Sequence, residues 1–398
     1  TRGAPVTTLR IAALRLATLG FLTFSGAGQV SGQSVFNAAG LGVPSEALDG
    51  RARSLGNLGI GLPGPGFIPT DPAAAGRLTL ATGVIASQPS WVEYSTSGTE
   101  SGSFQANRFP LLGVAYPIFQ GMASIQIGSF LDQRYTESSV GSVDLSTGTV
   151  PTLDEFVQNG SVSNVNLGYS RLFGRDIAAG LGVGRYAGSV VRTLTRTFED
   201  GSTGDVDSYV EEGRWSYTGH HLTAGVSTGL GDNVHVAASV QIPTALDASA
   251  SDETEGADRT YDLPVQYRFG ASATYGTLLF TGSAVLADWS GAQDALTGAV
   301  QAGSANGFGV GLEFSRARLW GRDAPLRFGF RRTGLPFSFG SDDVIERIMS
   351  GGVGLALNTT NDVVLAAVDL AIERGRRSGM GVVEKFWRAT VSFKASGF

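Results

Sequence analysis

Few residues of this 398-residue chain could carry catalysis. It has three histidines and no cysteine, which excludes thiol catalysis, a cysteine zinc site and disulfide bonds. His220 and His221 are adjacent, so on a strand their side chains point to opposite faces and cannot share a ligand. A serine hydrolase needs a serine beside a histidine, and no motif marks such a serine. The sequence therefore predicts no enzyme and no catalytic, cofactor or metal site.

The remaining candidates for ligand chemistry are also weak. The glycine-rich stretches 180–184 and 351–354 are not phosphate loops, because no P-loop lysine follows them. Asp342-Asp343 and Glu211-Glu212 could bind calcium, but solvated loop charge is the better interpretation. The formal charge is −6, and only two of the 29 basic residues are lysine. Without a basic tract, the chain is predicted to have no nucleic-acid partner.

Composition points to a particular kind of membrane protein. Glycine occupies 57 positions and charged residues make up 16% of the chain, yet hydrophobic residues reach only 42% and the mean hydropathy is +0.07. Membrane helices would need far more apolar sequence. A transmembrane β-barrel spreads its apolar surface over alternate residues, so it combines a lipid-facing exterior with moderate hydropathy. The predicted fold class is therefore all-β, a transmembrane antiparallel barrel.

The first residues are predicted to be a signal peptide. Arg10 and Arg15 precede an apolar run from Leu16 to Phe24, and Val30 and Gly32 place small side chains where a signal peptidase cuts. The run is too short for a spanning helix. We expect residues 1–32 to be removed on export.

Period-two alternation indicates which side chains face outward. In 234–242, 308–314, 326–330 and 387–393, every second residue is apolar. We expect one set to face lipid: Val234, Val236, Ala238, Val240, Ile242, Phe308, Val310, Leu312, Phe314, Leu326, Phe328, Phe330, Trp387, Ala389, Val391 and Phe393. The residues between them would face the interior. A β-sandwich alternates in the same way, so this pattern alone does not decide.

Connection lengths favour the barrel. Six short turns are predicted at 119–121, 174–176, 231–233, 275–277, 321–323 and 360–362. Seven longer polar loops are predicted near 89–103, 139–159, 199–212, 247–261, 289–303, 335–345 and 375–383. Outer-membrane barrels have short periplasmic turns and long external loops. The count predicts about fourteen strands of roughly 9–11 residues within residues 76–398.

Aromatic residues near the predicted strand ends are expected at the membrane interfaces. They are Trp91, Tyr116, Phe119, Tyr169, Phe173, Tyr275, Trp289, Trp320 and Trp387. The chain ends in Phe398, which predicts recognition by the barrel-assembly machinery.

Charged side chains are expected inside the barrel. The candidates are Arg108, Arg171, Arg268, Arg316, Arg327, Arg331 and Arg388, with Glu313 and Asp288 as acidic partners and His221 as a further interior residue. Such a set could form a network that holds a plug. It could instead form an anion path, as in a porin, and alternation does not separate the two.

Residues 33–75 precede the first predicted strand and do not alternate. Their run Arg51-Ala-Arg-Ser-Leu-Gly-Asn-Leu-Gly-Ile-Gly61 resembles the Ala-Arg-x-x-Gly-x-Gly-Gly stretch of the FadL superfamily of outer-membrane long-chain fatty acid and hydrophobe transporters, which includes PorV-type relatives. Asp71-Pro72-Ala73 stands where that superfamily carries Asn-Pro-Ala. The resemblance implies an N-terminal hatch inside a fourteen-stranded barrel, with Gly56, Gly59, Asp71, Pro72 and Ala73 as candidate hatch residues. A disordered periplasmic tail is the alternative.

The resemblance also implies a function. It predicts passive uptake of hydrophobic small molecules, such as long-chain fatty acids, across the outer membrane of a Gram-negative-type envelope. The partners would then be the lipid bilayer and a hydrophobic ligand. Two alternatives stay open: a PorV-like scaffold for protein secretion and a general diffusion porin. The motifs do not identify the substrate.

Overall fold

A computed structural model of the chain describes residues 34–97, 101–145, 148–198, 208–340, 342–360, 363–379 and 381–397. The predicted signal peptide and Phe398 lie outside these residues. Within the described part, no helix is long and apolar enough to cross a membrane. All of the described strands belong to one compact unit.

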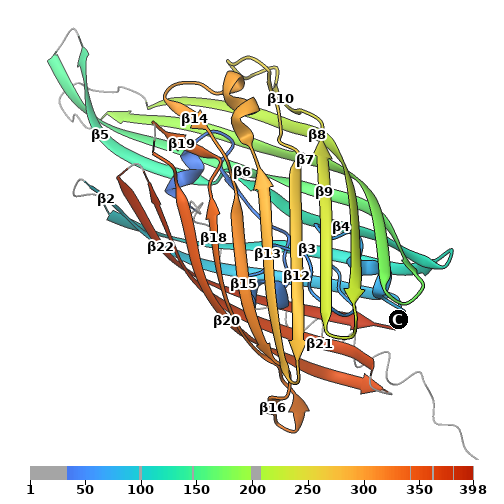
Figure 1. The fold of residues 1–398 in the computed structure, drawn as a ribbon. Coiled ribbons are helices and arrows are strands. Elements are labelled where there is room, and N and C mark those ends of the chain that lie inside the picture. Colours follow the sequence, from blue (N-terminus) through green and yellow to red (C-terminus); the bar gives the residue numbers. More distant parts are fainter. Residues whose placement is uncertain are drawn as a thin grey trace, which may run out of the picture. The chain divides into compact units, whose positions relative to one another are not determined.

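The strands form a closed antiparallel barrel of fourteen strands (Figure 1). Closure is made by β2, which pairs with β3 on one side and with β22 on the other. Three wall strands are built from two consecutive segments each. In chain order the wall consists of β2 (Thr82–Thr96), β3 (Ser101–Ile118), β4 (Gly121–Asp132) with β5 (Tyr135–Leu145), β6 (Gly148–Phe173), β7 (Ile177–Phe198), β8 (Tyr209–Leu230), β9 (Val234–Pro243) with β10 (Leu246–Ala250), β11 (Arg259–Tyr261) with β12 (Gln266–Tyr275), β13 (Leu278–Ala287), β15 (Gly307–Phe314), β18 (Leu326–Gly334), β20 (Ile345–Thr360), β21 (Val363–Gly379) and β22 (Val382–Ser396). The predicted fold class is confirmed.

Short elements complete the structure. The N-terminal segment contains η1 (Val35–Ala38), β1 (Val43–Pro44), α2 (Gly50–Ser54) and η2 (Ala74–Arg77). At the long-loop end, η3 (Trp289–Ala295) lies near a two-stranded sheet of β14 (Val300–Ala302) and β19 (Phe337–Phe339). At the short-turn end, β16 (Arg318–Leu319) pairs with β17 (Arg322–Asp323), and this hairpin projects from the wall in Figure 1.

The predicted register is confirmed in the four segments used to derive it. Val234, Phe308, Phe328 and Trp387 are exposed on the outer face. The side chains between the apolar sets point inward and are buried, among them Gln241, Glu313, Arg327, Arg331 and Arg388. An apolar exterior around a polar interior is the pattern of a membrane barrel.

The predicted connections are confirmed only in part. Tight turns join the strands at 119–120, 174–176, 231–233 and 276–277. A tight turn lies at 320–321, close to the predicted 321–323, but it closes the β16–β17 hairpin, so the connection between β15 and β18 spans 315–325 and is not short. The turn predicted at 360–362 falls partly outside the described residues. The loops near 89–103, 139–159 and 375–383 are wrong as well: the strands continue through most of these stretches. Beyond the apolar belt both faces of a strand meet water, so alternation disappears although the ladder continues.

The predicted interfacial aromatics are exposed with one exception. Phe119, Tyr275 and Trp320 are each more than 80% exposed, whereas Trp289 is only 2% exposed. Trp289 begins η3 and packs into a cluster inside the barrel, where its ring meets Phe337 at 5.4 Å. A tryptophan at a strand end can therefore turn inward when the following loop folds back over the lumen.

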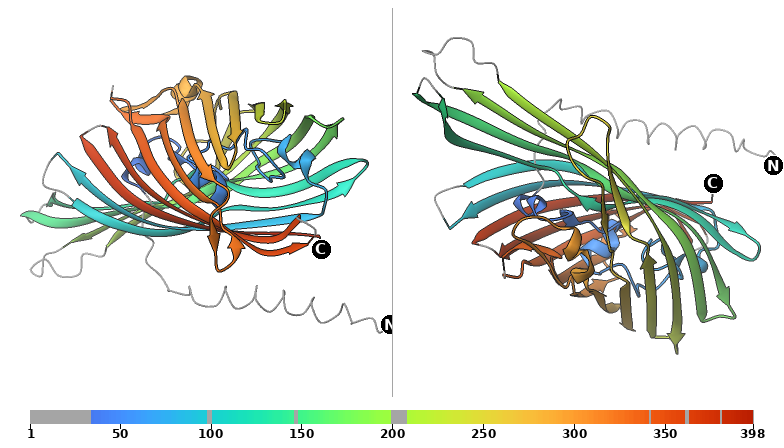
Figure 2. Two further views of the ribbon diagram at one scale, coloured as in Figure 1. Left: turned by 60° about the horizontal axis from the view of Figure 1, so that its bottom comes forward. Right: turned by 90° about the horizontal axis from the view of Figure 1, so that it is seen from above.

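The N-terminal segment, residues 34–75, lies within the ring of strands (Figure 2). Its backbone touches the wall where the wall carries glycine on its inner face. A methyl group at Gly329 would collide with the backbone of Leu55, one at Gly309 with Gly56, and one at Gly270 with Ile60. Close approach between two backbones, which only glycine permits, therefore explains the glycines at these wall positions.

This contact predicts that alanine substitutions at two wall glycines affect the stability of the barrel differently. Gly329→Ala places a methyl group against Leu55 and should destabilise the barrel by about 1–3 kcal/mol through overpacking. A methyl group at Gly282, on the outer face of β13, meets no atom within 4 Å, so Gly282→Ala is the control. The temperature at which the folded band disappears on a gel of unheated samples measures both. Equal shifts would show that the segment does not pack on the wall as described.

Candidate ligand cavity and the segment that bounds it

Ion pairs join the N-terminal segment to the barrel wall. Arg51 Nε lies 3.2 Å from Glu313 Oε2, and Arg53 Nη1 lies 3.4 Å from Glu373 Oε2. On another side, Glu46 Oε1 lies 3.1 Å from Arg268 Nη1, which also donates to the carbonyl of Leu58 at 2.8 Å. The segment is thus held by charged contacts to three strands.

The wall acids are shared with wall arginines. Arg327 contacts Glu313 at 2.6 Å, and Arg331 contacts Glu373 at 2.6 Å. Arg377 contacts Glu346 at 2.7 Å and Glu384 at 3.1 Å. Glu373 is fully buried. Breaking one partner of a buried pair typically costs about 3–5 kcal/mol, because the other charge is left without compensation.

The four predicted lumenal residues all lie inside the barrel. Arg327 and Arg331 are 4% and 6% exposed, and Glu313 and His221 are buried as well. The first three belong to the ion-pair network. His221 lies on the opposite side, where Nε2 is 2.7 Å from Asn164 Oδ1 and the ring is 4.9 Å from that of Tyr186.

The prediction that three other charged side chains face the interior is wrong. Arg171 shares the outer face with Tyr169 and Phe173, and its guanidinium lies 5.5 Å from the Phe173 ring. Arg316 is exposed after the end of β15, and Asp288 is exposed and caps η3 by accepting from Ser290. All three have the outward parity of their strands: Arg171 follows Tyr169, Arg316 follows Phe314 and Asp288 follows Leu286, each of which is exposed.

Several buried charges of the network were not predicted, namely Arg53, Glu346, Glu373, Arg377 and Glu384. Arg377 lies within the stretch 375–383 that the sequence indicated as loop, and Glu384 directly follows it. The signal was present in β21, where Glu373 and Arg377 share one parity and the outward Ile372 has the other.

The candidate hatch residues lie at the turns of the N-terminal segment. Gly56 and Gly59 have φ angles of 60° and 78°, which glycine adopts without strain. Pro72 packs on the wall, because a methyl group at Gly180 would meet its carbonyl and one at Gly225 its ring. Ala73 is fully buried just before η2.

Asp71 is buried in this joint. Its Oδ2 accepts from the Gly61 amide at 3.3 Å, while Oδ1 has no hydrogen-bond partner among the described residues. No ion pair of the described residues includes Asp71. Burial raises the pKa of the Asp71 carboxyl to about 6, although backbone amides and Arg77 oppose the rise.

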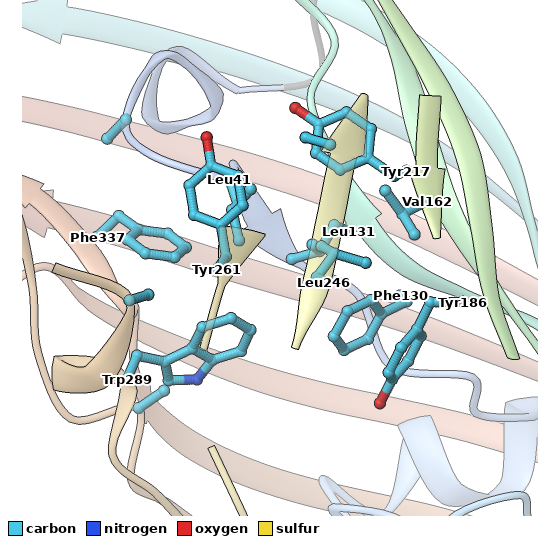
Figure 3. Packing of buried hydrophobic residues seen from close by; sticks show 14 of the residues in the cluster. Leu41, Phe130, Leu131, Val162, Tyr186, Tyr217, Leu246, Tyr261, Trp289 and Phe337 are labelled. Carbon is cyan, nitrogen blue, oxygen red and sulfur yellow. The ribbon is translucent and has the colours of Figure 1, made fainter. Parts of the chain in front are cut away.

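A cavity of about 130 Å³ lies between the N-terminal segment and the wall. Its lining combines three groups of side chains. Arginines and acids of the network face it from one side, an amide and hydroxyl patch from β6, β8 and β9 from another, and aromatic rings from the long-loop end. Representative lining residues are Arg108, Arg268, Asn166, His221, Thr223, Phe130 and Trp289. Figure 3 shows Phe130, Tyr186 and Trp289 within the cluster that covers the cavity.

The wall is interrupted beside this cavity. The ladder between β3 and β4 ends at Leu111 and Gly128. Towards the long-loop end, β3 continues to pair with β2, and β5 pairs with β6, while no pairing joins β3 to β5 among the described strands. The edge of β4 is taken by β1, in which Val43 pairs with Asp132 and Pro44 with Leu131. Pro110, which has no N–H to donate, stands at the point of separation.

The cavity reaches this interruption. Ser45 and Ala47 of the N-terminal segment, Arg108 of β3, and Ser129 and Phe130 of β4 all line it. Ser129 follows Ile125 and Ile127 in the outward parity of β4, and the register shifts between Ser129 and Leu131. A residue of outward parity therefore borders an interior cavity.

Comparison with solved structures finds barrels of the same fold. The chain is similar to a Pseudomonas aeruginosa FadL homologue, with 13% identity and a TM-score of 0.62 over 90% of this chain and 100% of that one. It is similar to the Ralstonia pickettii toluene transporter TbuX, with 14% identity and a TM-score of 0.54 over 89% and 99%. The P. putida toluene transporter TodX gives 12% and 0.54 over 89% and 98%.

These likenesses establish the fold: the barrel of this chain is similar to those of the structures named, and this is the fold that the motif resemblance implied. TbuX and TodX are described as toluene transporters. No protein-family model matches the chain, and no curated protein matches it by sequence.

The environment of Asp71 predicts a pH-dependent joint. A buried carboxyl whose pKa rises from 3.8 to about 6 favours the docked segment while it is protonated. Docking is therefore strongest below pH 4 and weakens as the pH rises to about 6, by about 3 kcal/mol at 1.36 kcal/mol per pKa unit. Asp71→Asn should remove this cost. At pH 7.5 the variant's segment should exchange its amide hydrogens more slowly than the wild type, whereas at pH 4 the two should match. Faster exchange in the variant at pH 7.5 would contradict this account.

Proposed function

We propose that the protein is an outer-membrane channel for the passive uptake of hydrophobic small molecules, in which the N-terminal segment acts as a hatch. The observation that carries this is the interior cavity that borders a break in the wall. A ligand that enters from the long-loop end meets the aromatic cluster first and then the cavity. The hatch blocks the axial path, and the separation of β3 from β4 and β5 supplies a path sideways.

A sideways exit suits a hydrophobic cargo. A molecule that leaves between two strands enters the apolar layer around the barrel without crossing water, so its partition into lipid drives net uptake. The apolar outer face indicates the lipid bilayer as the first partner. The names of the similar structures, toluene transporters and a FadL homologue, support the same class of cargo for this chain. Fatty acids and small hydrocarbons both belong to that class.

The two alternatives predicted from the sequence are less well supported. A general porin needs a water-filled lumen, whereas here a segment bound by buried ion pairs fills the interior. A PorV-like secretion scaffold does not need an interior ligand cavity, nor a cavity that reaches a break in the wall. Recognition of Phe398 by the barrel-assembly machinery and export through residues 1–32 remain parts of the proposal.

The sideways path predicts the effect of a bulky residue at the break. Ser129→Trp places a large ring where the cavity meets the break in the wall, and should slow uptake of a labelled hydrophobic compound into proteoliposomes about tenfold or more. Ile125→Trp, on the outer face of the same strand, is the matched control and should transport like the wild type. Both variants should keep the heat-modifiable band of a folded barrel. Undiminished uptake by a folded Ser129→Trp variant would rule out this exit.

A further inference from the structure

A row of cations crosses four neighbouring strands on the outer face of the barrel. In the ladder, Arg332 of β18 stands opposite Arg347 of β20. Arg347 in turn stands opposite Arg376 of β21, which stands opposite Lys385 of β22. These four residues, the cation row, are all exposed. Because neighbouring strands lie about 4.8 Å apart, the row extends for about 14 Å across the wall.

The cation row has no acidic partner within the described part of the chain. None of its members takes part in an ion pair there, although Glu93 of β2 stands opposite Lys385 and Asp342-Asp343 is exposed in the loop before β20. On the inner face of the same strands, by contrast, Arg331 and Arg377 each contact a glutamate. Like charges directly opposite each other on a sheet are destabilising. Four such cations in one row indicate that an anion from outside the chain neutralises them.

The cation row lies at the border of the apolar outer surface. Towards the short-turn end, the outward residues of the same strands are apolar and exposed, among them Phe328, Met349, Ile372 and Trp387. Next to the row, the Arg374 guanidinium lies 5.1 Å from the Trp387 ring. Tryptophan marks the head-group level of a membrane, and long loops lie outside the cell. The row is therefore at the head-group level of the outer leaflet.

The chemistry of the cation row is that of a phosphate receptor. The planar guanidinium group binds phosphate oxygens in a bidentate manner, and basic clusters beside a membrane bind anionic head groups. In an outer membrane, the outer leaflet carries lipopolysaccharide, whose lipid A holds two phosphates at opposite ends of a disaccharide above several acyl chains. A row of about 14 Å can reach both phosphates, and the apolar surface beside it can take the acyl chains.

We propose that the outer face of β18, β20, β21 and β22 is a binding site for lipopolysaccharide. The cation row holds the two phosphates of lipid A, and the apolar residues on the short-turn side of the row contact its acyl chains. The site goes beyond the proposed function, because none of the four cations lines the cavity. Binding of lipid A and uptake of a hydrophobic compound can therefore be tested separately, and the failure of one leaves the other standing.

The test measures binding of purified lipid A to the intact protein in non-ionic detergent by native mass spectrometry. The double variant Arg347→Gln with Arg376→Gln removes the two central cations of the row. It should bind lipid A about tenfold or more weakly, because charge-assisted hydrogen bonds to the phosphates are lost. The double variant Arg347→Lys with Arg376→Lys keeps the charges and should recover most of the affinity.

A second double variant, Arg171→Gln with Arg185→Gln, is the matched control. It removes the same number of charges from the outer face. Arg171 lies at the short-turn end, and Arg185 stands between Val165 and His220 in the ladder, so neither belongs to the cation row. This variant should bind lipid A like the wild type. Dephosphorylated lipid A, phosphatidylglycerol and inorganic phosphate are the control ligands, and each should bind the wild type more weakly than lipid A.

Thermal stability supplies an independent measurement. In detergent alone, the folded band of the Arg347→Gln, Arg376→Gln variant should persist to the same temperature as that of the wild type or to a higher one, because repulsion within the row is relieved. Lipid A should raise this temperature by several degrees in the wild type and leave it unchanged in the variant. An equal rise in both would contradict the site.

The remaining outcomes also decide. Equal losses of lipid A binding in the two glutamine double variants, or equal affinity for lipid A with and without its phosphates, would overturn the proposal. Phosphatidylglycerol that binds as tightly as lipid A would overturn it and indicate a surface for anionic lipids in general. Displacement of lipid A by inorganic phosphate alone would overturn it and indicate a site for the free anion.

Discussion

The structure depends on the close approach of two backbones inside the barrel. Fourteen strands enclose more space than their own side chains fill, and here the N-terminal segment occupies that space. It can do so because the wall carries glycine where the segment passes, at Gly270, Gly309 and Gly329. Backbone contact alone is weakly specific, and the ion pairs of Arg53 with Glu373 and of Glu46 with Arg268 define the position of the segment. The segment closes the lumen because its shape fits the wall, and the ion pairs fix its position there.

Because the N-terminal segment fills the axis of the barrel, a ligand would have to leave sideways, through the wall. The same segment that fills the axis lends β1 to the free edge of β4, so the break between β3 and β5 does not leave that edge without hydrogen bonds. The cavity lies where the segment, the break and the aromatic cluster meet. A movement of the segment would therefore change the cavity and the break together, and Asp71, buried in the joint beside Pro72, links that movement to pH.

The sequence predicted the features that follow from period and from local chemistry. Alternation identified the faces of β9, β15, β18 and β22, and the positive φ angles explain the glycines of the motif. Prediction from the sequence failed where contacts between distant residues determine the direction of a side chain or the length of a strand. Trp289 turns inward because η3 folds over the lumen, and the ladders of β6, β21 and β22 continue past the apolar belt through stretches that were predicted as loops. The cavity and the break in the wall come from pairing between strands, which no local pattern encodes.

The closure of the lumen is tested most directly by single-channel conductance in planar bilayers. The intact protein should conduct ions poorly, and deletion of residues 36–70 should raise the conductance several-fold or more, because it removes the segment that fills the axis. The heat-modifiable band must persist in the deletion variant, which shows that the barrel still forms. High conductance in the intact protein, or no change on deletion, would contradict the account and favour an open porin.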